Sequence, residues 1–197
     1  MKILLTSILL TIIILCGCHD RQPQAGNAAT DAPTEKKHFF PVVDYMRGQI
    51  RIVDSLPTAI LKVVTRDGKP DSSFIKRDEF DRLASEFIPA DLQQENFETH
   101  FKETSFLDQT TNSATFTYSS TDPKLALQRV DVLATPDEVY SKVKSIYLQE
   151  TLNKNDTVIV KKLIWQAKKR FQIATSEQAP NDRKKMTQVQ VTWFESE

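Results

Sequence analysis

Residues 157–178, TVIVKKLIWQAKKRFQIATSEQ, hold two runs in which apolar side chains recur with a period of two, on either side of Lys168-Lys169. That period places alternate side chains on opposite faces of a β-strand. Because only a short polar break separates the two runs, the chain turns back there and pairs them as a hairpin. The stretch therefore predicts two antiparallel strands.

The same pattern covers the C-terminal half of the chain from Asn112 onward. Short breaks rich in Asn, Asp, Pro and Lys separate its runs, which is typical of an antiparallel meander. The alternation slips at Gln128-Arg129, and this slip predicts a β-bulge. We expect strands at 113–120, 125–134, 139–152, 157–166, 171–178 and 186–195.

Helices are expected in the N-terminal half. Apolar side chains fall close to helical spacing in two segments there, each followed by a proline, and Asp91 can cap another short helix through Phe97. Asp78 is placed to cap the start of the clearest helix, and Pro89 to stop it. The predicted helices cover 41–55, 78–88 and 91–97.

One further hairpin is expected between the first two helices. Thr58–Thr65 has the composition of a strand, Asp67-Gly68 is a turn signal, and Ser73–Lys76 is its possible partner. The sequence of residues 98–107 shows no pattern that predicts a helix or a strand.

These patterns predict an α+β fold, in which two or three N-terminal helices pack on a C-terminal antiparallel β-meander of about five to six strands. We expect a single domain over residues 39–197. One face of its sheet, including Val191 and Trp193, would lie against the helices. The other face would stay largely polar, with Lys142, Lys144, Lys161 and Lys162 in solvent.

The N-terminus predicts export and lipid attachment. The apolar run Ile3–Leu15 has 13 residues, whereas a membrane-spanning helix needs roughly 20. It is therefore typical of a signal peptide. Leu15-Cys16-Gly17-Cys18 resembles a bacterial lipobox, which implies cleavage after residue 17 and a diacylglyceryl group on Cys18. The alternative is an ordinary secretory signal with a chance cysteine.

Residues 18–38 are predicted to form a flexible tether. His19 to Lys37 contains no aromatic or branched aliphatic side chain, so it cannot bury enough apolar surface to order itself. Its root-mean-square reach is roughly 25 Å. An acidic tract like that of surface-exported lipoproteins of Bacteroidota is missing, which favours a domain that faces the periplasm.

Composition excludes several classes of chemistry. Lys plus Arg equals Asp plus Glu at 26 each, so nucleic acid is not expected as a partner. Cleavage removes Cys16 and lipid occupies Cys18, which leaves the mature domain without a disulfide, a thiol nucleophile or a thiolate metal site. The four glycines form no phosphate-binding loop, and no cofactor or metal is expected.

Catalytic residues are equally scarce. His19 and His38 belong to the tether, which leaves His100 alone as a candidate acid–base group. The acids from Asp78 to Glu86 suit the first turns of a helix, although a catalytic carboxylate pair among them stays an alternative.

The sequence thus favours a non-enzymatic binding or envelope-assembly module, with a membrane attachment at Cys18 and an envelope protein as a possible partner. The alternative is a carrier of a lipid-like apolar ligand, and an enzyme that uses scattered carboxylates is the third class.

For a protein partner, we expect Tyr147 and Trp165 on neighbouring strands to form a partly exposed aromatic surface. The competing interpretation is that a curved sheet covers part of both faces of the strand 139–152. The basic groups 168–170 and 183–185 are expected at opposite ends of the sheet.

Three runs, at 74–80, 106–110 and 127–132, resemble small uncharacterised lipoproteins of Bacteroidota. The resemblance covers most of residues 39–195. It implies a lipoprotein of the cell envelope, but it carries over no activity and no functional residue.

Replacement of the lipobox cysteine tests the predicted attachment. Cys18→Ala should release or mislocalise the protein, because a single signal-peptide run too short to span the bilayer cannot replace the acyl chains. Membrane fractionation and the intact mass of the mature chain measure this. Unchanged membrane partition, together with no lipid mass on the wild-type protein, would contradict the prediction.

Overall fold

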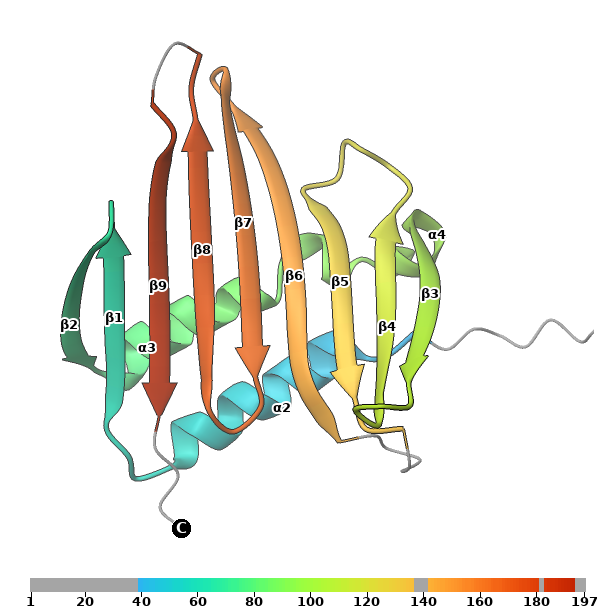
Figure 1. Cartoon of the computed structure of the whole chain (residues 1–197), viewed down its shortest axis with the longest axis horizontal. Coiled ribbons are helices and arrows are strands. Elements are labelled where there is room, and N and C mark those ends of the chain that lie inside the picture. The colour runs from blue at the N-terminus through green and yellow to red at the C-terminus, as the bar shows by residue number, and fades with distance from the viewer. Residues whose placement is uncertain (1–38, 137–141, 181–182, 194–197) are drawn as a thin grey trace, which may run out of the picture. The chain divides into compact units, whose positions relative to one another are not determined.

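The computed structural model describes residues 39–136, 142–180 and 183–193, and these belong to one compact unit (Figure 1). The predicted signal peptide, the tether and Cys18 lie outside the described residues. Strands make up 53% of the described residues and helices 22%. The sheet therefore dominates the fold.

All nine strands of the described chain belong to one antiparallel sheet with the order β2-β1-β9-β8-β7-β6-β5-β4-β3 (Figure 1). From β3 to β9 each strand pairs with the next along the chain. The bounds are β1 Ile60–Arg66, β2 Lys69–Ile75, β3 Phe101–Asp108, β4 Ser113–Ser120, β5 Leu127–Ala134, β6 Val143–Lys154, β7 Thr157–Gln166, β8 Arg170–Gln178 and β9 Lys185–Trp193.

The predicted fold class, an α+β domain with helices on a meander of five to six strands, is wrong. The six strands predicted after Asn112 are present, but β3 extends the meander and the hairpin of β1 and β2 joins the same sheet through β9. β3 carries mostly exposed side chains because it is an edge strand, so it shows little apolar alternation. The pairing of Ile60 with Trp193 leaves no local signal in the sequence.

Tight turns between strands use the residue types that tolerate left-handed backbone. Asp67 and Gly68, with φ of 48° and 80°, close the hairpin of β1 and β2 as the sequence predicted. The predicted bulge at Gln128-Arg129 is also confirmed, by a register shift between Leu127 and Arg129. Among the described residues, Lys168 is the one positive-φ residue that is neither Gly, Asn nor Asp. Such a conformation costs a side chain with a Cβ roughly 1–2 kcal/mol.

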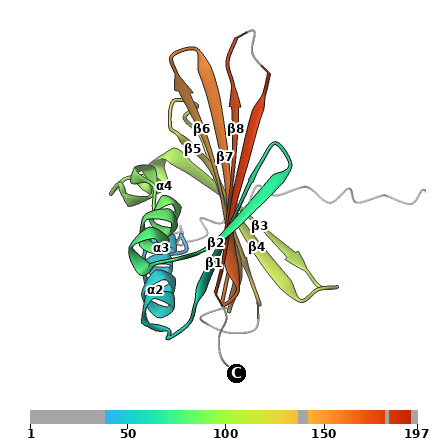
Figure 2. The same cartoon turned by 90° about the vertical axis from the view of Figure 1, so that its left-hand side faces the viewer.

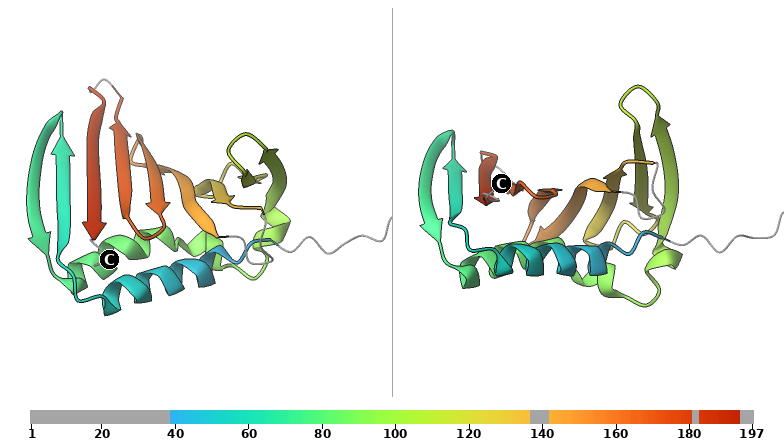
Figure 3. Two further views of the ribbon diagram at one scale, coloured as in Figure 1. Left: turned by 60° about the horizontal axis from the view of Figure 1, so that its bottom comes forward. Right: turned by 90° about the horizontal axis from the view of Figure 1, so that it is seen from below.

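The helices are few and short. They lie on one side of the sheet (Figure 2), while both edges of the sheet bend toward the other side (Figure 3). Asp78 does not cap its helix, whose N-terminal cap is Lys76 without a side-chain hydrogen bond. The bounds are α2 Val42–Ser55, α3 Arg77–Ala84 and α4 Phe97–His100, with 3-10 turns η1 Ser85–Phe87 and η2 Ala90–Gln93.

A cluster of aromatic rings holds α3 and η1 against the centre of the sheet. The Phe80 ring lies 5.8 Å from Phe171 and 5.9 Å from Trp193, centroid to centroid. The Phe87 ring lies 5.3 Å from Trp165. All five rings are at most 2% exposed, so this aromatic part of the core sits between the α3–η1 segment and strands β7 to β9.

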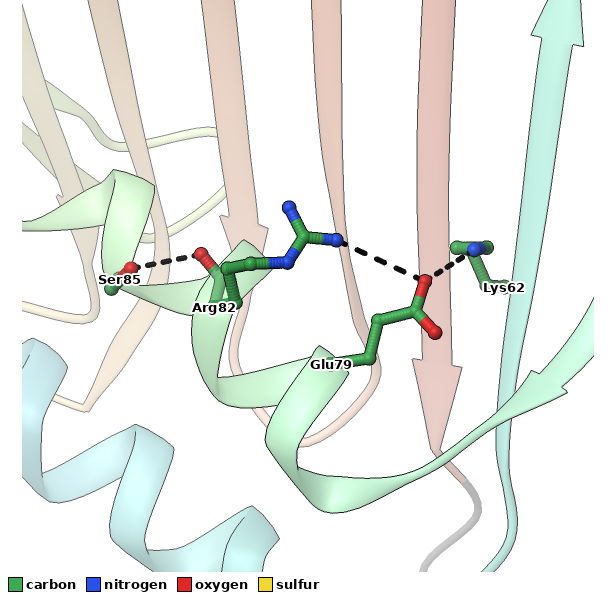
Figure 4. Close-up of polar contacts among 4 residues, drawn as sticks. All are labelled: Lys62, Glu79, Arg82 and Ser85. Atoms are coloured by element: carbon green, nitrogen blue, oxygen red, sulfur yellow. Dashed lines mark hydrogen bonds and ion pairs between the residues drawn. The ribbon is translucent and has the colours of Figure 1, made fainter.

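Two ion pairs fasten the same helical segment at its ends. Glu79 of α3 pairs with Lys62 of β1, and Arg82 approaches the same carboxylate at 4.0 Å (Figure 4). Glu86 of η1 accepts a 2.8 Å hydrogen bond from Lys161 of β7. Lys161 is therefore part-buried on the helix-covered face and not on the polar face, which corrects the prediction for this residue.

Arg77 links the two longest helices, α2 and α3. Its guanidinium donates hydrogen bonds to the carbonyl oxygens of Val53, Leu56 and Thr58, at 2.8 Å for Val53 and 2.9 Å for Thr58. Carbonyls at the C-terminal end of a helix have no partner within the helix. Arg77, the first residue of α3, thus donates hydrogen bonds to carbonyl oxygens at the C-terminal end of α2.

Arg77→Met should lower the free energy of unfolding by about 2 kcal/mol, because it leaves these part-buried carbonyls without their charged donor. Urea unfolding measures the change. Arg82→Met is the matched control, since that side chain is 68% exposed and its loss should change stability by less than about 0.5 kcal/mol. Equal losses from the two variants would contradict the role given to Arg77.

Candidate functional site

A cavity of about 1240 Å³ lies beside the N-terminal half of α2, on the helix-covered side of the sheet. Its walls come from segments far apart in the sequence: the entry segment 39–41, α2, strands β3 to β6, and the turn between β7 and β8. The lining falls into an apolar part and a basic part. The apolar and aromatic lining comprises Phe39, Phe40, Pro41, Tyr45, Phe116, Tyr118, Leu133, Ala134, Val143 and Ala167.

Stacked rings build the wall where the chain enters the domain. Phe39 stacks on Tyr118 with 4.9 Å between centroids, and it meets Phe97 edge-on at 5.8 Å. Phe40 meets Tyr45 of α2 at 5.7 Å. Aromatic pairs in these geometries add to the free energy of burial, so the entry segment is held by ring contacts to both α2 and β4.

One long-range hydrogen bond fixes the same segment. The backbone N–H of Phe40 donates to the Tyr118 hydroxyl at 3.0 Å. The carbonyl of Phe40 accepts from Val42 at 2.7 Å, which turns the chain into α2. The residue before a proline avoids helical backbone, so Phe40-Pro41 separates this extended wall from the helix.

The phenols in the wall are neutral groups. Burial raises the pKa of both Tyr45 and Tyr118 to about 12. A phenol with such a pKa is protonated at neutral pH and makes a poor general base there. The two tyrosines therefore supply apolar surface and uncharged hydrogen-bonding groups.

The basic part of the lining consists of four lysines, and Glu103 of β3 is the one carboxylate among the described lining residues. Lys144 is held in place, because its ammonium donates to Ser113 Oγ at 2.7 Å and to the Asn112 carbonyl at 3.3 Å. The N–H of Ala167 donates to the Lys144 carbonyl at 3.1 Å, which brings the β7–β8 turn beside the start of β6. The four lysines are Lys142, Lys144, Lys168 and Lys169.

The structure separates the two residues that the sequence placed on one aromatic surface. Tyr147 pairs with Ile164 and Trp165 pairs with Ile146, so the two rings point to opposite faces of the sheet. Trp165 is fully buried in the core. Tyr147 lies on the helix-free face, where its hydroxyl donates to Gln149 Oε1 at 3.0 Å. A register shift between β5 and β6 puts Val143 on the core side with Ile146, whereas strict alternation along the strand would place them on opposite faces.

Among the described residues, the candidate carboxylates do not form a pair; they make separate contacts that hold the fold together. Glu79 and Glu86 pair with lysines of the sheet, and Asp91 accepts a 2.8 Å hydrogen bond from the N–H of Leu127. Burial raises the pKa of Glu150, with Lys161 opposing the shift. Within the described ranges, no group of three or more His, Cys, Asp or Glu side chains is placed to hold a metal ion.

Sequence reasoning missed this cavity, although some of its parts carried signals. The predicted domain starts at residue 39, in the entry segment, and the polar break Lys168-Lys169 predicts a turn. The two basic groups do lie at turns on opposite ends of the sheet, as predicted (Figure 1). The pairing of β6 with β7 joins Lys168-Lys169 to Lys144, and that pairing register is what the sequence did not reveal.

No helix among the described residues combines the length and the apolarity needed to cross a bilayer. Comparison with protein-family models, curated proteins and solved structures finds no match. The resemblance to small lipoproteins of Bacteroidota therefore stays a prediction.

Loss of one hydroxyl tests whether the entry wall is fixed as described. Tyr118→Phe should lower the free energy of unfolding by about 1 kcal/mol, because the Phe40 N–H loses its acceptor. Tyr147→Phe removes a hydroxyl from the helix-free face and should change stability by less than about 0.5 kcal/mol. Thermal or urea unfolding of both variants measures the difference, and a larger loss in Tyr147→Phe would contradict the assignment.

Proposed function

We propose that the domain is a non-enzymatic binding module that carries a lipid-like apolar ligand in the cavity beside α2. The cavity itself is the observation that carries this proposal. Its volume of about 1240 Å³ exceeds the roughly 300–1,000 Å³ typical of pockets for small ligands. Aromatic and aliphatic side chains form most of its lining.

The energetics of burial favour a long ligand. Each methylene removed from water contributes about 0.8 kcal/mol, so ten methylenes contribute about 8 kcal/mol. That gain exceeds the lower end of the roughly 4–15 kcal/mol that association costs. An acyl chain meets this requirement, whereas a small apolar molecule does not.

The chemistry of the lining supports binding over catalysis. Its phenols are neutral, with pKa values of about 12, and Glu103 is the one carboxylate among the described lining residues. General acid–base catalysis needs a group that titrates near the working pH. The residues of the cavity supply apolar contacts and fixed positive charges instead.

The predicted membrane attachment fits such a carrier. With lipid on Cys18 and a tether of about 25 Å reach, the domain would work close to the envelope membrane and face the periplasm. The entry segment Phe39-Phe40 is part of the cavity wall. The tether would thus join the domain at its binding site.

The assembly module has weaker support. Among the described residues, the most exposed large apolar side chains are Phe74 at 73% and Phe106 at 68%. They lie on β2 and β3, at opposite edges of the sheet. Contiguous exposed apolar patches mark protein interfaces, and these two side chains are too far apart in the strand order to form one.

A bulky side chain in the cavity lining tests the proposed function. Gln49 of α2 lines the cavity, whereas Arg51 of the same helix is exposed and does not. Gln49→Trp should fill part of the cavity and lower binding of the uncharged fluorescent probe N-phenylnaphthylamine at least tenfold. Arg51→Trp should bind the probe like the wild type.

Fluorescence titration, with hexadecanol as the competing ligand, measures this. The proposal would be wrong if the wild-type protein showed no saturable fluorescence rise, or if Gln49→Trp and Arg51→Trp bound the probe equally well.

A further inference from the structure

The turn between β7 and β8 holds a lysine in a backbone conformation that suits glycine or asparagine. Lys168 has a φ of 61°. The other non-glycine residues with positive φ among the described ones are Asp67, Asn112, Asn155 and Asp156. Those types tolerate left-handed backbone far better than a lysine does. The chain thus keeps a strained residue at this one turn.

Backbone hydrogen bonds such as Lys169 N–H to the Gln166 carbonyl, at 3.2 Å, close the turn, but no contact of the Lys168 side chain with another described residue compensates for the strain. Lys168 and Lys169 are exposed, and neither ammonium has a hydrogen bond or an ion pair to another described residue. The paired residues Gln166 and Arg170 close the turn on both sides. Strained residues persist where function requires them, so the ammonium of Lys168 is the feature to explain.

Both of these lysines line the cavity, together with Lys142 and Lys144. Lys144 is pre-positioned by its hydrogen bonds to Ser113 and Asn112. The described lining residues include four lysines and one carboxylate, Glu103, although the whole chain has a formal net charge of zero. An amphiphile with a negative head group is the complement of an apolar wall beside such a cluster.

We propose that the ligand is a single-chain anionic lipid whose carboxylate or phosphate head group is bound by the lysines at the cavity, with Lys168 held in its strained turn for that contact. This inference rests on the proposed carrier function. The acyl chain lies against the aromatic wall around Phe116 and Tyr118, and the head group lies toward the turn. The proposed ligand is a monomeric lipid in the cavity and not the surface of a bilayer.

The strain makes an unusual test available, because removal of the lysine should improve folding while it harms binding. Lys168→Asn should raise the urea midpoint of unfolding, since asparagine adopts left-handed backbone more readily. It should weaken hexadecanoate binding about tenfold and leave hexadecanol binding unchanged. Lys124→Asn removes the same charge from the β4–β5 loop at the other end of the sheet, and it should change neither affinity.

Competition against N-phenylnaphthylamine gives both affinities, and Lys168→Gly serves as a second variant with the same expectation. Equal hexadecanoate affinity in wild type and Lys168→Asn, or an equal loss for hexadecanol, would overturn the head-group assignment alone. Failure of the wild-type protein to bind either ligand would overturn the carrier function as well. If Lys168→Asn lost binding to anionic vesicles but kept its affinity for monomeric hexadecanoate, the lysines would serve a membrane surface and the inference would be wrong.

Discussion

The fold depends on the packing of Phe80 and Phe87 into three adjacent strands. These rings contact Trp165, Phe171 and Trp193, which lie on the adjacent strands β7, β8 and β9. The indole N–H groups of both tryptophans in this cluster are buried and have no hydrogen-bond partner among the described residues. Each such group costs about 1–3 kcal/mol, so ring packing at this point must outweigh hydrogen bonding.

The cavity follows from a mismatch between a wide sheet and short helices. Nine strands spaced about 4.8 Å apart span about 38 Å, whereas the 14 residues of α2 reach about 21 Å. The central aromatic cluster fixes α3, and Arg77 ties the C-terminal end of α2 to it. The N-terminal half of α2 is left beside β4 to β6, where the entry segment covers the sheet only in part. The space that the described residues leave unfilled there is the cavity, and ring contacts from Phe39 and Phe40 keep its wall in place.

Local patterns predicted local structure and little beyond it. The period of two located six strands, the slip at Gln128-Arg129 located a bulge, and Asp67-Gly68 located a turn, because each depends on neighbouring residues. The pairing of β1 with β9 joins residues from opposite ends of the chain, so no period reveals it. Edge strand β3 lacks the alternation of a half-buried strand. Tyr147 and Trp165 were assigned to one surface because the strand register, which sets the faces, is not contained in either strand alone.

The cavity was beyond sequence reasoning for the same reason, since its lysines come from β6 and from a turn that only the sheet brings together.

Native mass spectrometry of the wild-type mature protein, released from membranes in mild detergent, tests most directly whether this cavity holds a ligand. The account predicts that the chain, with its covalent lipid on Cys18, carries one further species with the mass of a single-chain lipid. This further species is bound non-covalently and is lost on collisional activation. A spectrum that contains only the covalently lipidated chain under every gentle condition would contradict the account.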